Sequence, residues 1–222
     1  MIYVTGDMHG DPSRFKGLPL RRRDTLLVAG DFGFLWKDDK TEQRELERIG
    51  RLPFTTIFVD GTHENFPALE RYPLTFYGGA ECRRLGKNLY WARRGQVAVI
   101  EDRSIFLMGG GDSPVEDGRE PGVNWWPEES PTPKERADAR FLLSCVGNRV
   151  DYVVTHEPPQ RLHAFLDMDS VETTPLRGFF NELADMVAFR HWYFGSVHMD
   201  KRITPLYTAV FRDVIPLWPK KK

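Results

Sequence analysis

Five short apolar runs, each followed by a polar or glycine-rich cluster, restrict the fold of this chain more than any other feature. Short runs of β-branched and aromatic residues bounded by turn signals are typical of buried strands. In open α/β sheets, ligands bind beyond the carboxyl ends of such strands. The runs are residues 2–5 before GDMHG, 25–29 before GDFG, 56–59 before DGTHEN, 105–108 before GGGDS and 152–154 before THEPP.

The segments between these runs complete the fold prediction. Residues 40–51, residues 133–146 after Thr132 as N-cap, and residues 176–189 after Pro175 have helical patterns. Strands and helices alternate over the first seventy residues, which indicates βαβ units. Residues 88–108 read as a succession of hairpins and residues 202–218 as one or two antiparallel strands. We expect two mixed sheets in one α/β domain, residues 1–222, with 218–222 as a frayed tail and 112–133 as an ordered loop.

Composition excludes several classes of protein. With 31 Lys and Arg against 32 Asp and Glu, no net positive charge attracts nucleic acid or anionic lipid. Cys82 and Cys145 are far apart and lack metal-ligand spacing, which favours a reducing compartment. The chain opens without the pattern of a signal peptide, and it contains no apolar run of membrane-spanning length. We therefore expect a cytoplasmic protein without membrane contact; the oligomeric state is open.

Four of the six histidines fall in or beside the polar clusters: His9, His63, His156 and His198. In Asp7-Met8-His9 the i and i+2 side chains leave an extended segment on the same side, so a carboxylate and an imidazole can bind one cation. Asp31 of GDFG adds a carboxylate that could bridge two cations. Carboxylate with imidazole suits Mn, Fe, Zn or Ni better than Ca. The clusters therefore predict a metal site.

The ordered series GDMHG, GDFG, GTHEN, THEP and GSVHMD resembles the calcineurin-like metallophosphoesterase superfamily. That family's pattern is D-x-H, G-D-x-G, G-N-H-D/E, a later histidine and G-H-x-H. The GGGDS and WWPEE stretches are similar to those of small bacterial and phage members. The resemblance implies a four-layer αββα sandwich that holds a dinuclear metal centre, with Mn²⁺ as the first expectation.

The resemblance also implies roles for individual residues. The first metal would take Asp7, His9, Asp31 and His198, and the second would share Asp31 and take His156. His63 would lie beside the scissile phosphate, as general acid for the leaving oxygen or as a stabiliser of transition-state charge.

Two positions depart from the family pattern, and both belong to the second metal. Thr62 stands where the family has Asn, and Ser196 stands where it has His. A neutral hydroxyl is a poorer ligand than an imidazole, and Thr lacks the amide carbonyl of Asn. We therefore expect one tightly bound ion, a weak or absent second ion, and slow turnover.

For four other residues the sequence is compatible with either a functional or a structural role. Trp125 and Trp126 could stack on a base or aryl leaving group or cover the core. Asp112 could point into the cleft or form a local turn. For Glu64 we favour orientation of its loop or a helix cap over a direct role in the site.

The sequence thus predicts a metallophosphoesterase that hydrolyses a phosphodiester or phosphomonoester, acting as phosphodiesterase or phosphatase through a metal-activated water with Asp31 and His63 as catalytic residues. The substrate would be a small phosphoester or a nucleotide. The alternative is a catalytically impaired relative that binds a phosphorylated ligand or a partner protein.

Overall fold

The central strands of this chain are buried on both faces, and their alternating side chains supply two separate apolar layers. In the computed structural model, which describes residues 1–113, 120–166 and 173–218, Ile2 and Val4 of strand β1 (Ile2–Thr5) enter the layer between two sheets. Tyr3, between them, packs on the opposite face. Strand β8 (Arg103–Met108) does the same in the second sheet, with Ile105 and Leu107 pointing inward. A period of two between apolar layers explains why these runs are continuously hydrophobic.

The first sheet has the strand order β13-β1-β2-β3-β6-β5-β4. Strands β1, β2, β3 and β6 are parallel to one another, whereas β13, β5 and β4 pair antiparallel with their neighbours. The further strands of this sheet are β2 (Thr25–Ala29), β3 (Thr55–Val59), β4 (Leu74–Tyr77), β5 (Ala80–Gly86), β6 (Leu89–Ala92) and β13 (Ile215–Pro216).

The second sheet has the strand order β11-β12-β10-β9-β8-β7. Its central strands β12, β10, β9 and β8 are parallel, and the edge strands β11 and β7 are antiparallel. The further strands are β7 (Gln96–Ile100), β9 (Tyr152–Thr155), β10 (His191–Phe194), β11 (Lys201–Thr204) and β12 (Tyr207–Ala209).

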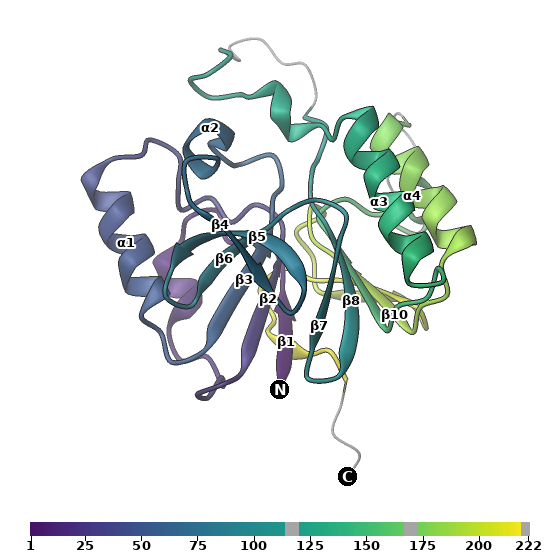
Figure 1. Ribbon diagram of the computed structural model, residues 1–222, viewed down its shortest axis with the longest axis horizontal. Coiled ribbons are helices and arrows are strands. Elements are labelled where there is room, and N and C mark those ends of the chain that lie inside the picture. The colour runs from purple at the N-terminus through teal and green to yellow at the C-terminus, as the bar shows by residue number, and fades with distance from the viewer. Residues whose placement is uncertain (114–119, 167–172, 219–222) are drawn as a thin grey trace.

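Helices cover the outer faces of both sheets, α1 on one side and α3 with α4 on the other (Figure 1). Their bounds are α1 (Lys40–Gly50), α2 (Phe66–Leu69), α3 (Pro133–Cys145) and α4 (Pro175–Met186), with 3-10 turns at Pro12–Phe15, Pro127–Glu129 and Gln160–Phe165. Thr132 caps α3 in a capping box with Glu135, as the sequence predicts for that N-cap. The fold is therefore the expected αββα sandwich of two mixed sheets.

The structure corrects the prediction of hairpins over residues 88–108. Only β7 and β8 form a hairpin there, because β6 pairs with β3 and β5 in the other sheet. Trp91 of β6 packs with the cluster beneath α1, and the chain then crosses between the sheets at Gly95, which packs against Ala139 of α3. The β4–β5 hairpin and strand β10 are additions that the sequence patterns do not predict.

The carboxyl-terminal segment is packed further than expected. Trp218, predicted to begin a frayed tail, stacks on Tyr152 with ring centroids 5.8 Å apart and joins the layer between the sheets. Residues 219–222 of that tail and residues 114–119 of the predicted loop 112–133 lie outside the described residues. No helix in the described part of the chain combines the length and apolarity of a membrane span.

Candidate metal centre

The predicted site residues follow the carboxyl ends of five parallel strands. Asp7 and His9 follow β1, Asp31 follows β2, and Thr62 with His63 follows β3. His156 follows β9, and Ser196 with His198 follows β10. Residues as far apart in the chain as Asp7 and His198, which are 191 positions apart (198 − 7), come within contact distance here.

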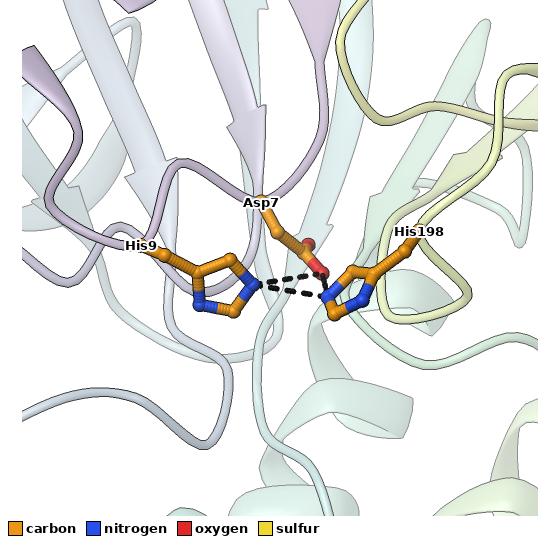
Figure 2. A group of neighbouring side chains, drawn as sticks. All are labelled: Asp7, His9 and His198. Atoms are coloured by element: carbon orange, nitrogen blue, oxygen red, sulfur yellow. Dashed lines mark hydrogen bonds and ion pairs between the residues drawn. The ribbon is translucent and has the colours of Figure 1, made fainter.

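Three of these side chains form one group of potential metal ligands (Figure 2). Nε2 of His198 lies 3.0 Å from Oδ2 of Asp7 and 3.0 Å from Nε2 of His9. Oδ2 of Asp7 is buried and makes no hydrogen bond, and Nε2 of His9 is 4.0 Å from it. A buried carboxylate oxygen that faces two imidazole nitrogens is the donor set of a divalent transition ion.

Asp31 belongs to a second group rather than to the first. Its Oδ2 lies 3.8 Å from Nδ1 of His9 and 2.7 Å from Nδ1 of His63, so His9 lies between two donor groups. The sequence-based expectation placed Asp31 with Asp7, His9 and His198 around one ion. In this structure the two nitrogens of His9 face the two carboxylates separately.

His156 lies between the two carboxylates but completes no donor group of three in the described residues. Its Nδ1 is 3.5 Å from Oδ1 of Asp7, and its Nε2 is 3.6 Å from Oδ1 of Asp31. Thr62 and Ser196 approach the same oxygens through backbone amides: Thr62 N donates to Asp31 at 2.6 Å and Ser196 N to Asp7 at 3.3 Å. The hydroxyl of Thr62 also lies 3.5 Å from Oδ1 of Asp31, so this position offers a neutral hydroxyl where the family pattern has an amide.

Charge within the cluster shifts the pKa of each group. Burial raises the pKa of Asp31, but the charges of His156 and His63 outweigh it and hold that pKa below its usual range. Burial lowers the pKa of His156, and the carboxylates of Asp31 and Asp7 raise it well above its ordinary value. The hydrogen bond to Asp31 raises the pKa of His63. Burial also raises the pKa of Asp7, but the charge of His156 outweighs it and lowers that pKa, so both carboxylates are kept ionised, as metal binding requires.

The backbone is strained at the same place. His9, Asp31, Ser196 and His198 have φ of 47°, 39°, 55° and 48°, in the left-handed region that side chains rarely adopt. Such conformations cost about 1–3 kcal/mol each and gather at functional sites. The polar loops pack so closely that a Cβ on Gly61 would lie 2.1 Å from Oδ1 of Asp31.

The comparisons with known proteins agree with this geometry. The family model for calcineurin-like phosphoesterases matches residues 1–200. The chain belongs to the calcineurin-like phosphoesterases. Metal-dependent hydrolysis of phosphoesters is therefore its general chemistry, and the family implies divalent metal ions for the donor groups just described.

The comparison with solved structures shows only that the fold is similar. A solved structure similar to this phosphoesterase is the phosphopantetheinyl hydrolase from Mycobacterium tuberculosis, at 16% identity and a TM-score of 0.52. The match covers 95% of this chain and 89% of that one. No curated protein matches the chain.

Sequence reasoning misses the residues that position the ligands of this phosphoesterase. Arg14 donates to the backbone oxygen of Asp7 at 2.6 Å and to Oγ1 of Thr5 at 2.9 Å. It also donates to the backbone oxygen of Phe211, whose ring stacks on His198 with centroids 4.9 Å apart. The arginine thus joins the loop that carries Asp7 to the segment whose phenylalanine ring packs on His198, but no motif marks it.

A second set of contacts positions the loop that carries His63. Glu64 is fully buried, and its Oε1 accepts the amide of Phe32 at 2.7 Å, which is the loop-orienting role that we favoured for it. Asp60, at the end of β3, accepts from Nε1 of Trp91 at 2.9 Å and from Nη2 of Arg94 at 2.6 Å. Asp60 and Arg94 are both buried.

The structure also places the three predicted substrate-binding residues. Trp126 is 5% exposed and belongs to the core beneath α1, which is the core-covering alternative. Trp125 is only partly buried. Asp112 accepts a hydrogen bond from the hydroxyl of Ser130 and joins neither donor group. None of the three lines the small hollow beside His63, whereas Trp36 does.

Proposed function

We propose that this chain hydrolyses a small phosphodiester or phosphomonoester with one tightly held transition ion, Mn²⁺ as the first candidate, and that it does so slowly. The supporting observation is the group formed by Asp7, His9 and His198, in which two imidazole nitrogens 3.0 Å apart face a buried carboxylate. Two imidazole nitrogens held this close to each other and to a carboxylate are stabilised by a cation between them. Mn²⁺, Fe, Zn or Ni suits such donors.

A bound divalent ion would polarise the phosphoryl oxygen and lower the pKa of water near it. The chain's own residues supply the remaining chemistry. The 2.7 Å hydrogen bond between Nδ1 and Asp31 raises the pKa of His63 and so favours its cationic form, and no group in the described residues bonds Nε2 of His63. The Nε2 proton is therefore available to the departing oxygen, and we assign His63 as general acid.

We assign the weakness of the second ion to the residues at positions 62 and 196. Ser196 contacts Asp7 through its backbone amide, and Thr62 contacts Asp31 through its amide at 2.6 Å and its hydroxyl at 3.5 Å, so neither position supplies an imidazole or an amide oxygen. Changes outside the ligands themselves already lower metal affinity by about 10- to 100-fold. Loss of two ligands should weaken a second ion at least as much.

Hydrolysis of chromogenic phosphodiester and phosphomonoester substrates, by protein stripped of metal and titrated with Mn²⁺, tests the proposal. We expect turnover that rises with Mn²⁺ and disappears in Asp31→Asn, and the preferred ester identifies the substrate class. Absence of turnover above that variant, with Mn²⁺ bound, would contradict the proposal.

The departures at Thr62 and Ser196 also favour a second candidate, a binding protein that retains the fold and one ion. The double variant Thr62→Asn/Ser196→His separates the two. A large gain in turnover means that the natural centre is impaired and supports binding as its role. Unchanged turnover in an active enzyme supports catalysis by the centre as it is.

A further inference from the structure

A hollow of about 230 Å³ opens beside the donor groups, lined by His9, Gly33, Trp36 and His63. Two of its walls are imidazoles of the candidate centre. The indole of Trp36 is the largest apolar surface among the four. A bulky aromatic side chain in the wall of a polar metal site needs an explanation, since neither the metal nor a phosphate group binds to it.

The indole is held in position from several sides. Its ring meets that of the buried Trp126 edge to face, with centroids 4.8 Å apart and planes at 85°. The backbone amide of Trp36 donates to Glu42 of α1 at 2.9 Å, and its carbonyl accepts from Nδ2 of Asn65 at 2.7 Å. A fixed ring loses little conformational freedom when a ligand binds, which favours recognition.

Trp36 also lies next to the proposed proton donor. Its ring centroid is 6.0 Å from that of His63, and the planes make an angle of 31°. His63 is tied to Asp31 through Nδ1 and its side chain is 55% exposed. A group that leaves phosphorus and takes a proton from His63 therefore departs beside the indole.

We propose that Trp36 is a specificity-determining residue that stacks on a planar aromatic group carried by the leaving side of the phosphoester. This inference rests on the proposed hydrolytic function and adds the class of substrate: aromatic rather than alkyl phosphoesters. The planar group can be an aryl ring attached directly to the ester oxygen or a nucleobase one sugar away. Aromatic rings stack on indole at offset contact distances, and the face of every base can do so.

The surroundings favour a neutral ring over a cationic group at this indole. A cation can bind to the face of tryptophan. Here, however, the hollow is bounded by His9 and His63, which belong to the two groups of potential ligands for a divalent cation. A second positive charge in the same hollow would be repelled.

The test measures binding, so that it does not depend on turnover. Isothermal titration of the Mn²⁺-loaded protein compares phenylphosphonate with methylphosphonate, and adenosine 5′-monophosphate with ribose 5-phosphate. Stacking lost on truncation is worth about 1–3 kcal/mol, a factor of at least about 5 in affinity. We expect the wild type to prefer the aromatic member of at least one pair by about tenfold, and Trp36→Leu to remove that preference while Trp36→Phe retains most of it.

Trp218→Leu is the matched control, because Trp218 is also partly buried and stacked but lies beside Tyr152 at the opposite ends of the strands. Preference in the phosphonate pair identifies an aryl group, and preference in the sugar pair identifies a nucleobase. Equal affinities within both pairs, or a preference that survives in folded Trp36→Leu, would overturn the inference. If Trp36 determines binding in this way but no ester is hydrolysed, the proposed function fails and the stacking site stands.

Discussion

Nε2 of His9 and Nε2 of His198 lie 3.0 Å apart, although the two residues are 189 positions apart in the chain. Two imidazole nitrogens at this distance share a proton or bind a common cation. Oδ2 of Asp7 lies 3.0 Å from the His198 nitrogen, which makes the cation the better occupant. The first predictions concern this group.

Mn²⁺ should stabilise the folded chain, because a ligand that binds only the native state raises its free energy of unfolding. At a concentration 100 times the dissociation constant the gain is about 2.7 kcal/mol. For a protein of this size that is a rise in Tm of roughly 5–11 °C. Differential scanning fluorimetry with Mn²⁺ and with chelator measures it, and His198→Gln should lose most of the rise. An equal rise in His198→Gln would show that the ion binds elsewhere.

Replacement of His63 by Gln should separate metal affinity from turnover. As general acid, His63 contributes about 100-fold or more to the rate and little to binding of the ion. We expect kcat to fall by at least about 100-fold while the dissociation constant for Mn²⁺ stays within about threefold. If His63 instead ligates an ion with His9 and Asp31, the affinity for Mn²⁺ should fall with the rate. Calorimetric titration of wild type and variant distinguishes these results.

The stoichiometry of tight metal binding should be one ion per chain. The side chains at positions 62 and 196 are neutral hydroxyls, which are poorer metal ligands than an amide oxygen or an imidazole. In Thr62→Asn/Ser196→His we expect a second binding event, because an amide oxygen and an imidazole are restored. Two equally tight ions in the wild type, measured by titration calorimetry and elemental analysis, would contradict the prediction.

The buried pair of Asp60 and Arg94 should be important for stability. Removal of one partner leaves an uncompensated buried charge, which costs about 3–5 kcal/mol. Urea denaturation of Arg94→Ala should show a loss of that order. Arg140→Ala breaks the more exposed pair with Glu182 and serves as control, with an expected loss below about 1 kcal/mol. Similar losses in both variants would show that burial does not set the strength of the first pair.

Much of the fold and of the candidate site can be predicted because the determinants are local. Each polar cluster follows its strand directly, so the run before GDFG indicates both β2 and the position of Asp31. Trp36 could not be found in this way, since its approach to His63 depends on how two loops 27 positions apart pack. The same holds for Arg94, which lies 34 residues from Asp60. The β6–β7 connection was predicted wrongly because strand patterns do not show when the chain changes sheets.

His191 should make stability fall in mildly acidic solution. Burial, assisted by the charge of Arg202, lowers the pKa of His191 from 6.5 to about 4. At a pH below 6.5, His191 of the unfolded chain binds a proton, whereas His191 of the folded chain stays neutral until the pH is near 4. The free energy of unfolding therefore decreases as pH falls through this window, whereas above the window His191 contributes nothing.

The variant His191→Gln isolates this contribution, because it cannot titrate but can still bond the hydroxyl of Thr208, which lies 2.8 Å from Nε2. Urea denaturation at pH 7 and pH 5 measures the difference between wild type and variant at each pH. We expect the wild type to lose more stability than the variant between these two values. Equal losses of stability in the two proteins would show that other groups cause the acid sensitivity. A larger loss in the variant would contradict the prediction.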